Sequence, residues 1–307
     1  MDRLRAMSVF VAVAELGSFA AAADRAGVSR TAASRLVKEL EAHLGAALMN
    51  RTTRRLSLTR AGNAYLERVR RALELIEDAD REAHSGAQSP RGTVRVSAPM
   101  AFGVRHIAPR LGAYLDRYGD VDIDLVLNDR RVDLVEEGFD LAVRIGRLAD
   151  SSLIARTIAT TRMVLCASAS YLEAHGQPAR PDDLTGHNCL GYAFWSGRNR
   201  WELIGPDGTP VAVAVSGRLW SNNGDALVNA AAGGLGIIFQ PDFIVHEALA
   251  RGSLIEVLEG HAGPEIGIHV VYAPTAFMPT RVRSFIDFLA RSFAGPRPWS
   301  PAGADSA

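Results

Sequence analysis

Hydrogen-bond donors and cations recur at helical spacing between residues 29 and 38. They are Ser29, Arg30, Thr31, Ser34, Arg35 and Lys38. Apolar residues lie between them and just beyond, at Ala33, Leu36, Val37, Leu40 and Leu44. This pattern predicts an amphipathic helix with one buried stripe and one outward stripe of donors. Such donors near the start of a helix can bond to base edges in the major groove of DNA. For any single residue, the alternative is an ordinary solvated helix face.

Two shorter helices are predicted before this one. Apolar residues recur at spacings of three and four over residues 4–14, and Gly17 ends that helix. Ser18 is a predicted N-cap for a second helix whose inward positions are mostly alanine, so another helix can cross it closely. Gly27 supplies the turn before the third helix, which Ser29 can cap. Two helices joined by a glycine turn, the second with a cationic outer face, are typical of a helix-turn-helix that reads the major groove.

The segment Asn50–Thr59 alternates arginine and hydroxyl side chains with two strand-like leucines. It is predicted to be a wing whose cations and hydroxyls contact phosphates, which adds affinity but little sequence discrimination. The expected contacts are Arg51, Thr52, Arg54 and Arg55. Residues 25–60 contain eight Lys and Arg residues against two Glu residues, although the whole chain has a net charge of zero. A local basic patch of this kind favours nucleic acid binding.

Six short motifs follow one another between residues 17 and 62. They are Gly17-Ser18-Phe19-Ala20-Ala21-Ala22-Ala23, Val28-Ser29-Arg30-Thr31-Ala32-Ala33-Ser34-Arg35, Leu40-Glu41, Leu44-Gly45, Arg51-Thr52-Thr53-Arg54 and Leu58-Thr59-Arg60-Ala61-Gly62. Together they resemble the DNA-binding domain of LysR-type transcriptional regulators. The resemblance implies an N-terminal all-α winged helix-turn-helix at residues 1–60, a linker and dimerisation helix at residues 61–87, and a C-terminal α/β effector-binding domain at residues 93–295.

A long helix with a heptad seam is predicted after Thr59. The seam residues are Tyr65, Val69, Ala72, Ile76, Ala79 and Ala83, widened by Leu66 and Leu73. The pattern predicts that the helix pairs with its copy in a second chain, which sets the distance between two DNA-reading helices. Because only about three heptads are present, a helix packed on its own domain is the alternative. Proline and glycine in Gln88-Ser89-Pro90-Arg91-Gly92 predict a linker and a domain boundary.

From Thr93 onward, short β-rich runs alternate with helical ones, which predicts an α/β domain with largely parallel sheets. Ligands of such domains bind beyond the carboxyl ends of strands. Three such places carry polar groups. They are Ser97-Ala98-Pro99-Met100, then Arg144 before Ile145-Gly146, and then Asn222 and Asn223 within Ser221–Asp225. In each case the alternative is structural, namely helix capping for the serine and asparagines and an internal ion pair for Arg144.

By resemblance to the family, this C-terminal half comprises two subdomains like those of periplasmic binding proteins, with the effector between them. The implied division is 93–166 with 271–295 for the first subdomain and 167–270 for the second, the chain crossing near Cys166 and Val271. Further effector contacts implied by approximate position are Phe194, Ile238 and Phe239. Core packing is the alternative role for the aromatic residues of this region.

The residues give little support to an enzyme. Gly233-Gly234-Leu235-Gly236 follows a predicted helix and precedes an apolar strand, the reverse of the order that a dinucleotide loop requires. Serine-hydrolase, zinc-protease and phosphate-loop motifs are missing, and the histidines share no spacing, so we expect no catalysis and no cofactor. Cys166 and Cys189 form neither a CxxC pair nor a metal-ligand cluster, so we expect two buried thiols and no metal.

Two binding proteins compete with a regulator. A small-molecule solute-binding protein would share the C-terminal pattern but would need export. No charged and apolar leader begins at Met1, and charged residues interrupt every apolar stretch, so we expect a cytoplasmic protein without a membrane partner. The other alternative is a DNA-architectural protein without effector control. Footprinting that changes with an effector would separate it from a regulator.

The sequence therefore predicts a sequence-specific, DNA-binding transcriptional regulator that is controlled by a small molecule. Its expected partners are double-stranded DNA, the effector, further copies of the chain in a homodimer or homotetramer, and RNA polymerase. A small carboxylate or aromatic acid is the effector class that the family resemblance suggests.

Overall fold

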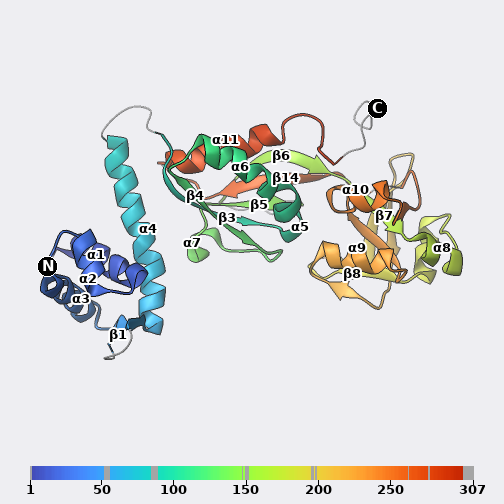
Figure 1. Cartoon of the computed structure of the whole chain (residues 1–307). Coiled ribbons are helices and arrows are strands. Elements are labelled where there is room, and N and C mark those ends of the chain that lie inside the picture. Colours follow the sequence, from blue (N-terminus) through green and yellow to red (C-terminus); the bar gives the residue numbers. More distant parts are fainter. Residues whose placement is uncertain are drawn as a thin grey trace. The chain divides into compact units, whose positions relative to one another are not determined.

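The computed structural model describes residues 2–51, 56–83, 89–146, 148, 152–194, 197, 199–261, 263–275 and 277–299, without the side chains of residues 51, 78 and 81–83. The chain divides into two compact units, Met1–Gln88 and Ser89–Ala307. Figure 1 colours the first unit blue to cyan and the second teal to red. The division lies inside the segment 88–92 that was predicted to be a linker.

The N-terminal unit is mainly helical. Its elements are α1 (Arg3–Leu16), α2 (Phe19–Arg25), α3 (Arg30–Leu44), β1 (Met49–Arg51), β2 (Leu56–Leu58) and α4 (Arg60–Ala83). Gly17 ends α1 with a φ of 61°, which glycine adopts without strain. Ser18 caps α2 by accepting the N–H of Ala21 at 3.3 Å. Ser29 caps α3 in the same way, accepting the N–H of Ala32 at 3.1 Å. The three predicted helices are therefore confirmed.

The core of this unit forms where α1, α2 and α3 meet. Its buried residues include Val9, Phe10, Val13, Ala22, Ala23, Ala33, Val37 and Leu40. The alanines of α2 let this short helix cross its neighbours closely. Because Ala33, Val37 and Leu40 all point inward, the rotation of α3 about its own axis is fixed, and its polar stripe must face outward.

Backbone contacts hold the wing strands against the helices. The strands β1 and β2 are antiparallel, with Met49 opposite Leu58. One oxygen of the Glu41 carboxylate, near the end of α3, accepts the N–H groups of Leu48 at 2.8 Å and Met49 at 3.1 Å. A Cβ added at Gly62 would lie 2.0 Å from the Leu48 carbonyl oxygen, so only glycine fits there. The wing strands are thereby fixed to both α3 and α4.

Helix α4 uses its predicted seam in two different ways. Val69 is 4% exposed, and Tyr65 packs on a phenylalanine of α1 with ring centroids 5.7 Å apart. Leu66 and Leu73 also pack against the core of this unit. The prediction of a seam for a second chain is therefore wrong for the first half of α4, which covers its own domain. In the second half Ile76 is 38% exposed and remains available.

The C-terminal unit is an α/β structure. Its elements are β3 (Gly92–Ala98), α5 (Met100–Phe102), the π-helical turn η1 (Gly103–Ile107), α6 (Ala108–Arg117), β4 (Val121–Leu127), α7 (Leu134–Glu137), β5 (Leu141–Ile145), β6 (Ile154–Thr161), β7 (Met163–Ala167), α8 (Ala169–His175), the 3-10 helix η2 (Pro181–Gly186), β8 (Cys189–Tyr192), β9 (Arg200–Ile204), β10 (Pro210–Ala214), β11 (Trp220–Ser221), α9 (Gly224–Ala232), β12 (Ile237–Pro241), α10 (Asp242–Ala250), β13 (Ile255–Glu256), β14 (Ile266–Tyr272) and α11 (Thr280–Ser292). The predicted alternation of strands and helices is confirmed.

Two five-stranded sheets organise this unit, with the strand orders β4-β3-β5-β14-β6 and β11-β8-β12-β7-β13. In each sheet three neighbouring strands pair in parallel, and the other pairings are antiparallel. Within these two sheets the antiparallel pairings all involve β6, β7, β13 or β14, the strands next to the two crossings of the chain, while β9 and β10 form a separate antiparallel pair. The prediction of largely parallel sheets is therefore corrected to mixed sheets.

The chain crosses between the two sheets earlier than predicted in both directions. It leaves the first sheet at Arg162, between β6 and β7, and returns between β13 and β14. Cys166 pairs with a residue of β12 and Val271 with a residue of β5, so both lie inside sheets. The divisions 93–166 with 271–295 and 167–270 are therefore wrong by several residues. Only Arg162 separates β6 from β7, and it is neither a glycine nor a proline, so the sequence carried no turn signal to show where one strand ends.

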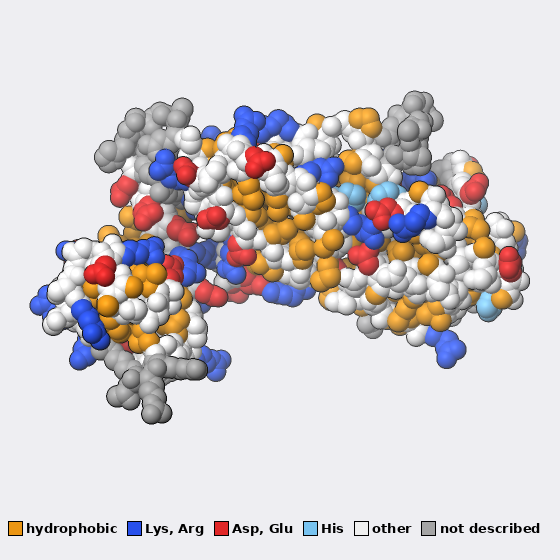
Figure 2. Space-filling model, viewed as in Figure 1, with side chains coloured by type: hydrophobic (Ala, Val, Ile, Leu, Met, Phe, Trp, Pro, Cys, Tyr) orange, Lys and Arg blue, Asp and Glu red, His pale blue; other side chains and the backbone are white. Residues whose placement is uncertain are grey.

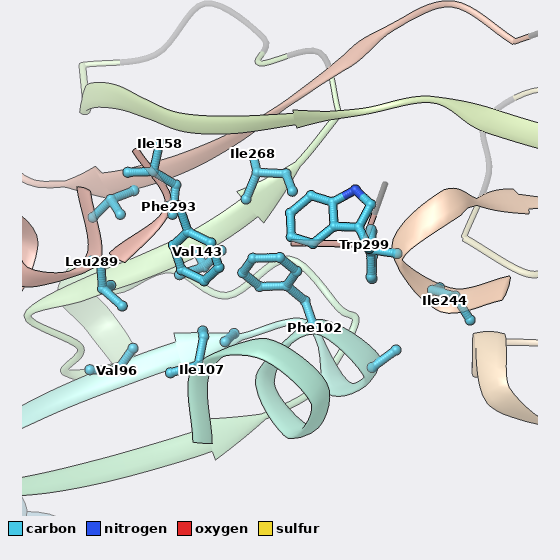
Figure 3. Packing of buried hydrophobic residues seen from close by; sticks show 14 of the residues in the cluster. Val96, Phe102, Ile107, Val143, Ile158, Ile244, Ile268, Leu289, Phe293 and Trp299 are labelled. Carbon is cyan, nitrogen blue, oxygen red and sulfur yellow. The ribbon is translucent and has the colours of Figure 1, made fainter. Parts of the chain in front are cut away.

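Both sheets share one hydrophobic core. Its buried residues include Val96, Phe102, Ile107, Val143, Ile158, Ile238, Ile244, Ile268, Leu289, Phe293 and Trp299. Figure 3 shows the Phe102 ring near Phe293 and Trp299, with Ile244 on the other side of Trp299. The two sheets form subdomains that are joined by apolar burial as well as by the two crossings of the chain.

His106 is a titratable group inside this core and is 5% exposed. Its Nε2 donates to the carbonyl oxygen of Phe243 at 3.3 Å, and its ring centroid lies 4.8 Å from that of Trp299. Burial lowers the pKa of His106 to about 4, and neighbouring His and Arg charges act in the same direction. The ring is therefore neutral in the folded protein at neutral pH.

We predict that His106 makes the fold sensitive to acid. Between pH 6.5 and about 4 the unfolded chain binds a proton at this residue and the folded chain does not, so the free energy of unfolding falls as the pH falls. A loss of about 2–3 kcal/mol is expected at pH 4.5 relative to neutral pH. His106→Gln keeps a donor but does not titrate. In urea unfolding its stability should fall less over this range, and equal losses in both proteins would contradict the prediction.

Candidate functional site

The outer face of α3 presents the predicted DNA-contacting residues together. The exposed ones are Ser29, Arg30, Thr31, Arg35 and Lys38, while Ser34 is half-buried. The Arg35 side chain is 72% exposed. Figure 2 shows several Lys and Arg side chains on the surface of the N-terminal unit. The structure thus brings all six residues onto one solvent-facing side of a helix.

Two local interactions position this face. The Ser29 hydroxyl oxygen accepts the N–H of Ala32, so Ser29 is a helix cap whatever else it contacts. Arg35 Nε lies 3.7 Å from an oxygen of Glu39, one turn further along α3. An exposed pair of this type contributes only a few tenths of a kcal/mol, so the Arg35 guanidinium can exchange it for a DNA contact.

The predicted wing residues lie only partly within the described chain. Strand β1 ends at Arg51, whose backbone pairs with Leu56 of β2. Thr52, Arg54 and Arg55 lie outside the described residues, as does the side chain of Arg51. Their contacts with phosphates stay a prediction.

At the end of β3 the backbone rather than Ser97 supplies the polar group that faces a carboxylate. Ser97 and Ala98 are each 1% exposed, so the Ser97 hydroxyl, which was predicted to meet an effector carboxylate together with backbone N–H groups, is buried in this structure. Pro99 precedes α5, and Met100 is 38% exposed. The N–H of Met100 donates to a carboxylate oxygen of Asp129 at 3.0 Å. The carboxylate expected from an effector is therefore supplied by the chain itself.

The predicted place at the start of α9 meets this strand end. Asn223 caps α9, with its side-chain oxygen accepting the N–H of Ala226 at 2.9 Å. Its amide nitrogen lies 3.0 Å from the sulfur of Met100, which joins the two subdomains. Asn222 is exposed beside it. The structure thus unites two of the three predicted places, and the structural role proposed as an alternative for Asn223 is confirmed.

An ion-pair bridge lies next to this contact. Arg105 of η1 lies 2.6 Å from Asp225 of α9 and 3.2 Å from Glu247 of α10. Burial lowers the pKa of Arg105, but the bonds and charges of the two carboxylates outweigh it and raise the pKa. Arg105 also lowers the pKa of Glu247. The bridge therefore favours the charged forms of Arg105 and Glu247.

Asp129 and Tyr192 complete the group and were missed by the sequence analysis. Burial raises the pKa of Asp129, opposed by its hydrogen bonds with Met100 and Tyr192. Burial also raises the pKa of the Tyr192 hydroxyl. Asp129 follows the strand that was predicted at residues 121–127, so the strand-end rule could have found it. Tyr192 begins a segment without a recognisable pattern.

Arg144 has a structural role. Its guanidinium donates to the backbone carbonyls of Arg130 at 3.2 Å and Val132 at 2.9 Å. Burial lowers the pKa of Arg144. The side chain holds the loop that leads to α7, through carbonyl groups rather than the predicted ion pair. Its donors are thus used inside its own subdomain.

The three residues implied by approximate position differ from one another. Phe194 is 53% exposed, and its ring lies 6.2 Å from that of Tyr192, beside the Asp129 group. Ile238 and Phe239 of β12 are 0% and 2% exposed. Successive residues of a strand point to opposite faces, and these two belong to separate buried clusters. Their predicted effector contacts are contradicted, because both side chains are core.

Other kinds of site find no support within the described residues. Cys166 and Cys189 are free and buried, and burial raises both pKa values, that of Cys189 to about 12. The prediction of two buried thiols is confirmed. Among the described side chains no three His, Cys, Asp or Glu residues are placed to hold a metal ion. None of the described helices combines the length and apolar character needed to cross a bilayer.

Two family models match the chain, one for each unit. Residues 4–63 match a bacterial regulatory helix-turn-helix protein of the lysR family. Residues 87–294 match the LysR substrate binding domain. The two matches therefore cover both the surface of α3 and the group around Met100 and Asn223.

Known proteins are similar over nearly the whole length. An uncharacterized HTH-type transcriptional regulator of Haemophilus influenzae is 39% identical, covering 92% of this chain and 98% of the relative. The structure of CrgA, a LysR-type regulator from Neisseria meningitidis, is 34% identical with a TM-score of 0.61, covering 94% and 98% of the two chains. The full-length structure of the Vibrio cholerae virulence activator AphB is 30% identical with a TM-score of 0.58, covering 92% and 97%. The chain therefore belongs to the LysR family of transcriptional regulators, which bind DNA under the control of a small-molecule effector.

Proposed function

We propose that the outer face of α3 reads base edges in the major groove of an operator. The observation that carries this proposal is the exposure of Arg30, Thr31 and Arg35 on the side of α3 opposite its buried stripe. Arginine pairs bidentately with guanine, and hydroxyls bond to several bases. The arginines of the wing add phosphate contacts in this proposal, which supply affinity and register.

Self-association through the second half of α4 completes the DNA-binding proposal. Leu75 is 59% exposed and Ile76 38% exposed, while Ala72 and Ala79 are also exposed. Burying these apolar side chains against a second copy removes them from water. A dimer, or a tetramer of dimers, then presents paired α3 helices to two half-sites. At a promoter, RNA polymerase is the further partner that we propose.

The proposed effector site is the group formed by Met100, Asp129, Tyr192 and Asn223, with Phe194 at its edge. Both subdomains contribute to it, as the contact between Met100 and Asn223 illustrates. A small molecule bound there has an affinity that depends on the relative placement of the two subdomains. Such a difference in affinity is what a ligand needs in order to shift a conformational equilibrium. The expected carboxylate or aromatic acid would have to displace or protonate Asp129, which already accepts the Met100 N–H.

Regulation by binding alone, in the cytoplasm and without catalysis, is the activity that we propose. The relatives that match over the whole chain are named as regulators of transcription. Footprinting of an operator with and without the effector separates this proposal from a DNA-architectural protein. A footprint that no small molecule changes would favour the architectural alternative.

Arg35→Ala tests the reading face. If Arg35 bonds to a base, the variant should lose about 1–3 kcal/mol of affinity for an operator selected from random duplexes. Arg218→Ala removes the same charge from an exposed position in the other unit and should leave the affinity unchanged. Fluorescence anisotropy at one salt concentration measures both. Equal weakening on operator and random DNA would show that Arg35 contacts phosphate only.

Ser29 tests whether capping and reading can be separated. Ser29→Ala removes the acceptor for the Ala32 N–H and should lower the free energy of unfolding by about 1 kcal/mol. Ser29→Asn restores an N-cap and should restore stability. If Ser29 also contacts DNA, the stable Asn variant will still bind the operator differently from the wild type. Unchanged affinity would assign Ser29 to capping alone.

Asp129→Asn tests the effector site. A thermal-shift screen of the full chain against benzoate and other small organic acids identifies any acid that stabilises it. Removing the carboxylate removes repulsion of a bound anion, so that acid should bind Asp129→Asn at least about tenfold more tightly. Asp122→Asn, at an exposed position on β4, is the matched control. Equal binding to the wild type and both variants would place the effector elsewhere.

A further inference from the structure

The segment that follows α11 returns to the junction of the two subdomains. Trp299 is 2% exposed, although it follows the last helix by several residues. Its ring centroid lies 4.8 Å from His106, 5.8 Å from Phe243 and 6.0 Å from Phe102. Figure 3 shows the indole above the Phe102 ring. A large side chain from the end of the chain thus fills part of the shared core.

Both subdomains form the seat of this indole. Phe102 and His106 belong to α5 and η1 of the first subdomain, whereas Phe243 belongs to α10 of the second. These three rings also contact one another, with Phe102 and Phe243 edge to face at 5.3 Å. The His106 ring donates to the Phe243 carbonyl as well. Rotation of one subdomain against the other therefore cannot keep all the contacts of Trp299.

A second anchor of the same segment lies at the crossings of the chain. Arg297 lies 3.8 Å from Asp242 and 3.9 Å from Glu265. The buried carboxylate of Asp242 also accepts the hydroxyl of Thr161 at 2.5 Å, where the chain leaves the first sheet. Glu265 immediately precedes β14, where the chain returns. Arg297 thus joins the C-terminal segment to both crossings.

The two crossings of the chain would by themselves allow one subdomain to rotate against the other. Domain hinges are usually a few residues at element ends that absorb changes in backbone angle, and Arg162 lies at such an end, between β6 and β7. Phe293–Trp299 adds a third link, which arrives from α11 and contacts both sides of the junction. The ion pair between Arg105 and Asp225 spans the same junction. Its geometry, and that of the contact between Met100 and Asn223, depends on the angle which this third link restrains.

We propose that Phe293–Trp299 is a clasp that holds the two subdomains in one relative arrangement, with Trp299 as its head and Arg297 as its second contact. Release of Trp299 from its seat widens the range of subdomain orientations. The clasp thereby contributes to the free energy that an effector must supply to change the arrangement of the two subdomains. This last consequence rests on the proposed function, whereas the clasp itself does not.

Distances between spin labels in the full chain test the clasp. Asp116→Cys on α6 and Glu173→Cys on α8 place exposed labels on the two subdomains, while the native thiols are buried and protected. Mixing labelled with excess unlabelled chain removes distances between copies. Trp299→Ala should broaden the distance distribution at least twofold. A distribution as narrow as that of the wild type would overturn the proposal.

Trp201→Ala is the matched control. Trp201 is 4% exposed and packs on Phe239 of the second subdomain, with ring centroids 5.5 Å apart. Its loss should lower stability but leave the distribution narrow, and equal broadening would show general loosening and overturn the clasp. If Trp299→Ala does not fold, Arg297→Gln takes its place. A broadened distance distribution in that variant would support the clasp, and a distribution as narrow as that of the wild type would overturn it. The readout involves neither DNA nor effector, so failure of the proposed function would be seen separately.

Discussion

The placement of α3 depends on one constraint, which is that its buried stripe has to face α1 and α2. Ala33, Val37 and Leu40 are fully buried, so the helix has a single rotation compatible with the core. The cations and hydroxyls on the opposite side are then presented outward. The caps at Ser18 and Ser29 fix where the helices begin. The orientation of the proposed DNA-reading face is thus a consequence of hydrophobic packing inside the N-terminal unit.

The C-terminal unit has to meet two requirements, because it must be stable and must also respond to a ligand. A shared apolar core joins its two sheets, while polar groups collect at strand ends where the subdomains meet. Arg105 pairs with two carboxylates, and Asp129 accepts the Met100 N–H, so these polar groups already have partners within the chain. An effector bound at the proposed site therefore has to replace existing interactions, and its affinity reflects the difference between the two sets of interactions.

The sequence allowed the DNA-binding unit to be predicted almost completely, because helix caps, glycine turns and apolar stripes are local signals. The proposed effector site was only partly predictable. The strand-end rule found Met100 and Asn223 but not Tyr192, whose place depends on pairing between distant strands. Ile238 and Phe239 were misassigned because a buried strand and a ligand-lining strand are equally apolar. The seam of α4 was misread in its first half, since one apolar stripe serves its own core and a partner alike.

The Glu41 carboxylate has a consequence for the kind of duplex that this protein can grip. It joins the end of α3 to the start of the first wing strand through two backbone N–H groups, which fixes the position of β1 relative to α3. In the proposed binding mode, α3 and the wing can both contact only a duplex of matching groove dimensions. A duplex whose bases suit α3 but whose phosphates lie at another distance keeps the contacts of α3 and loses those of the wing. Groove dimensions, which vary with sequence beyond the contacted bases, thus become part of what is selected.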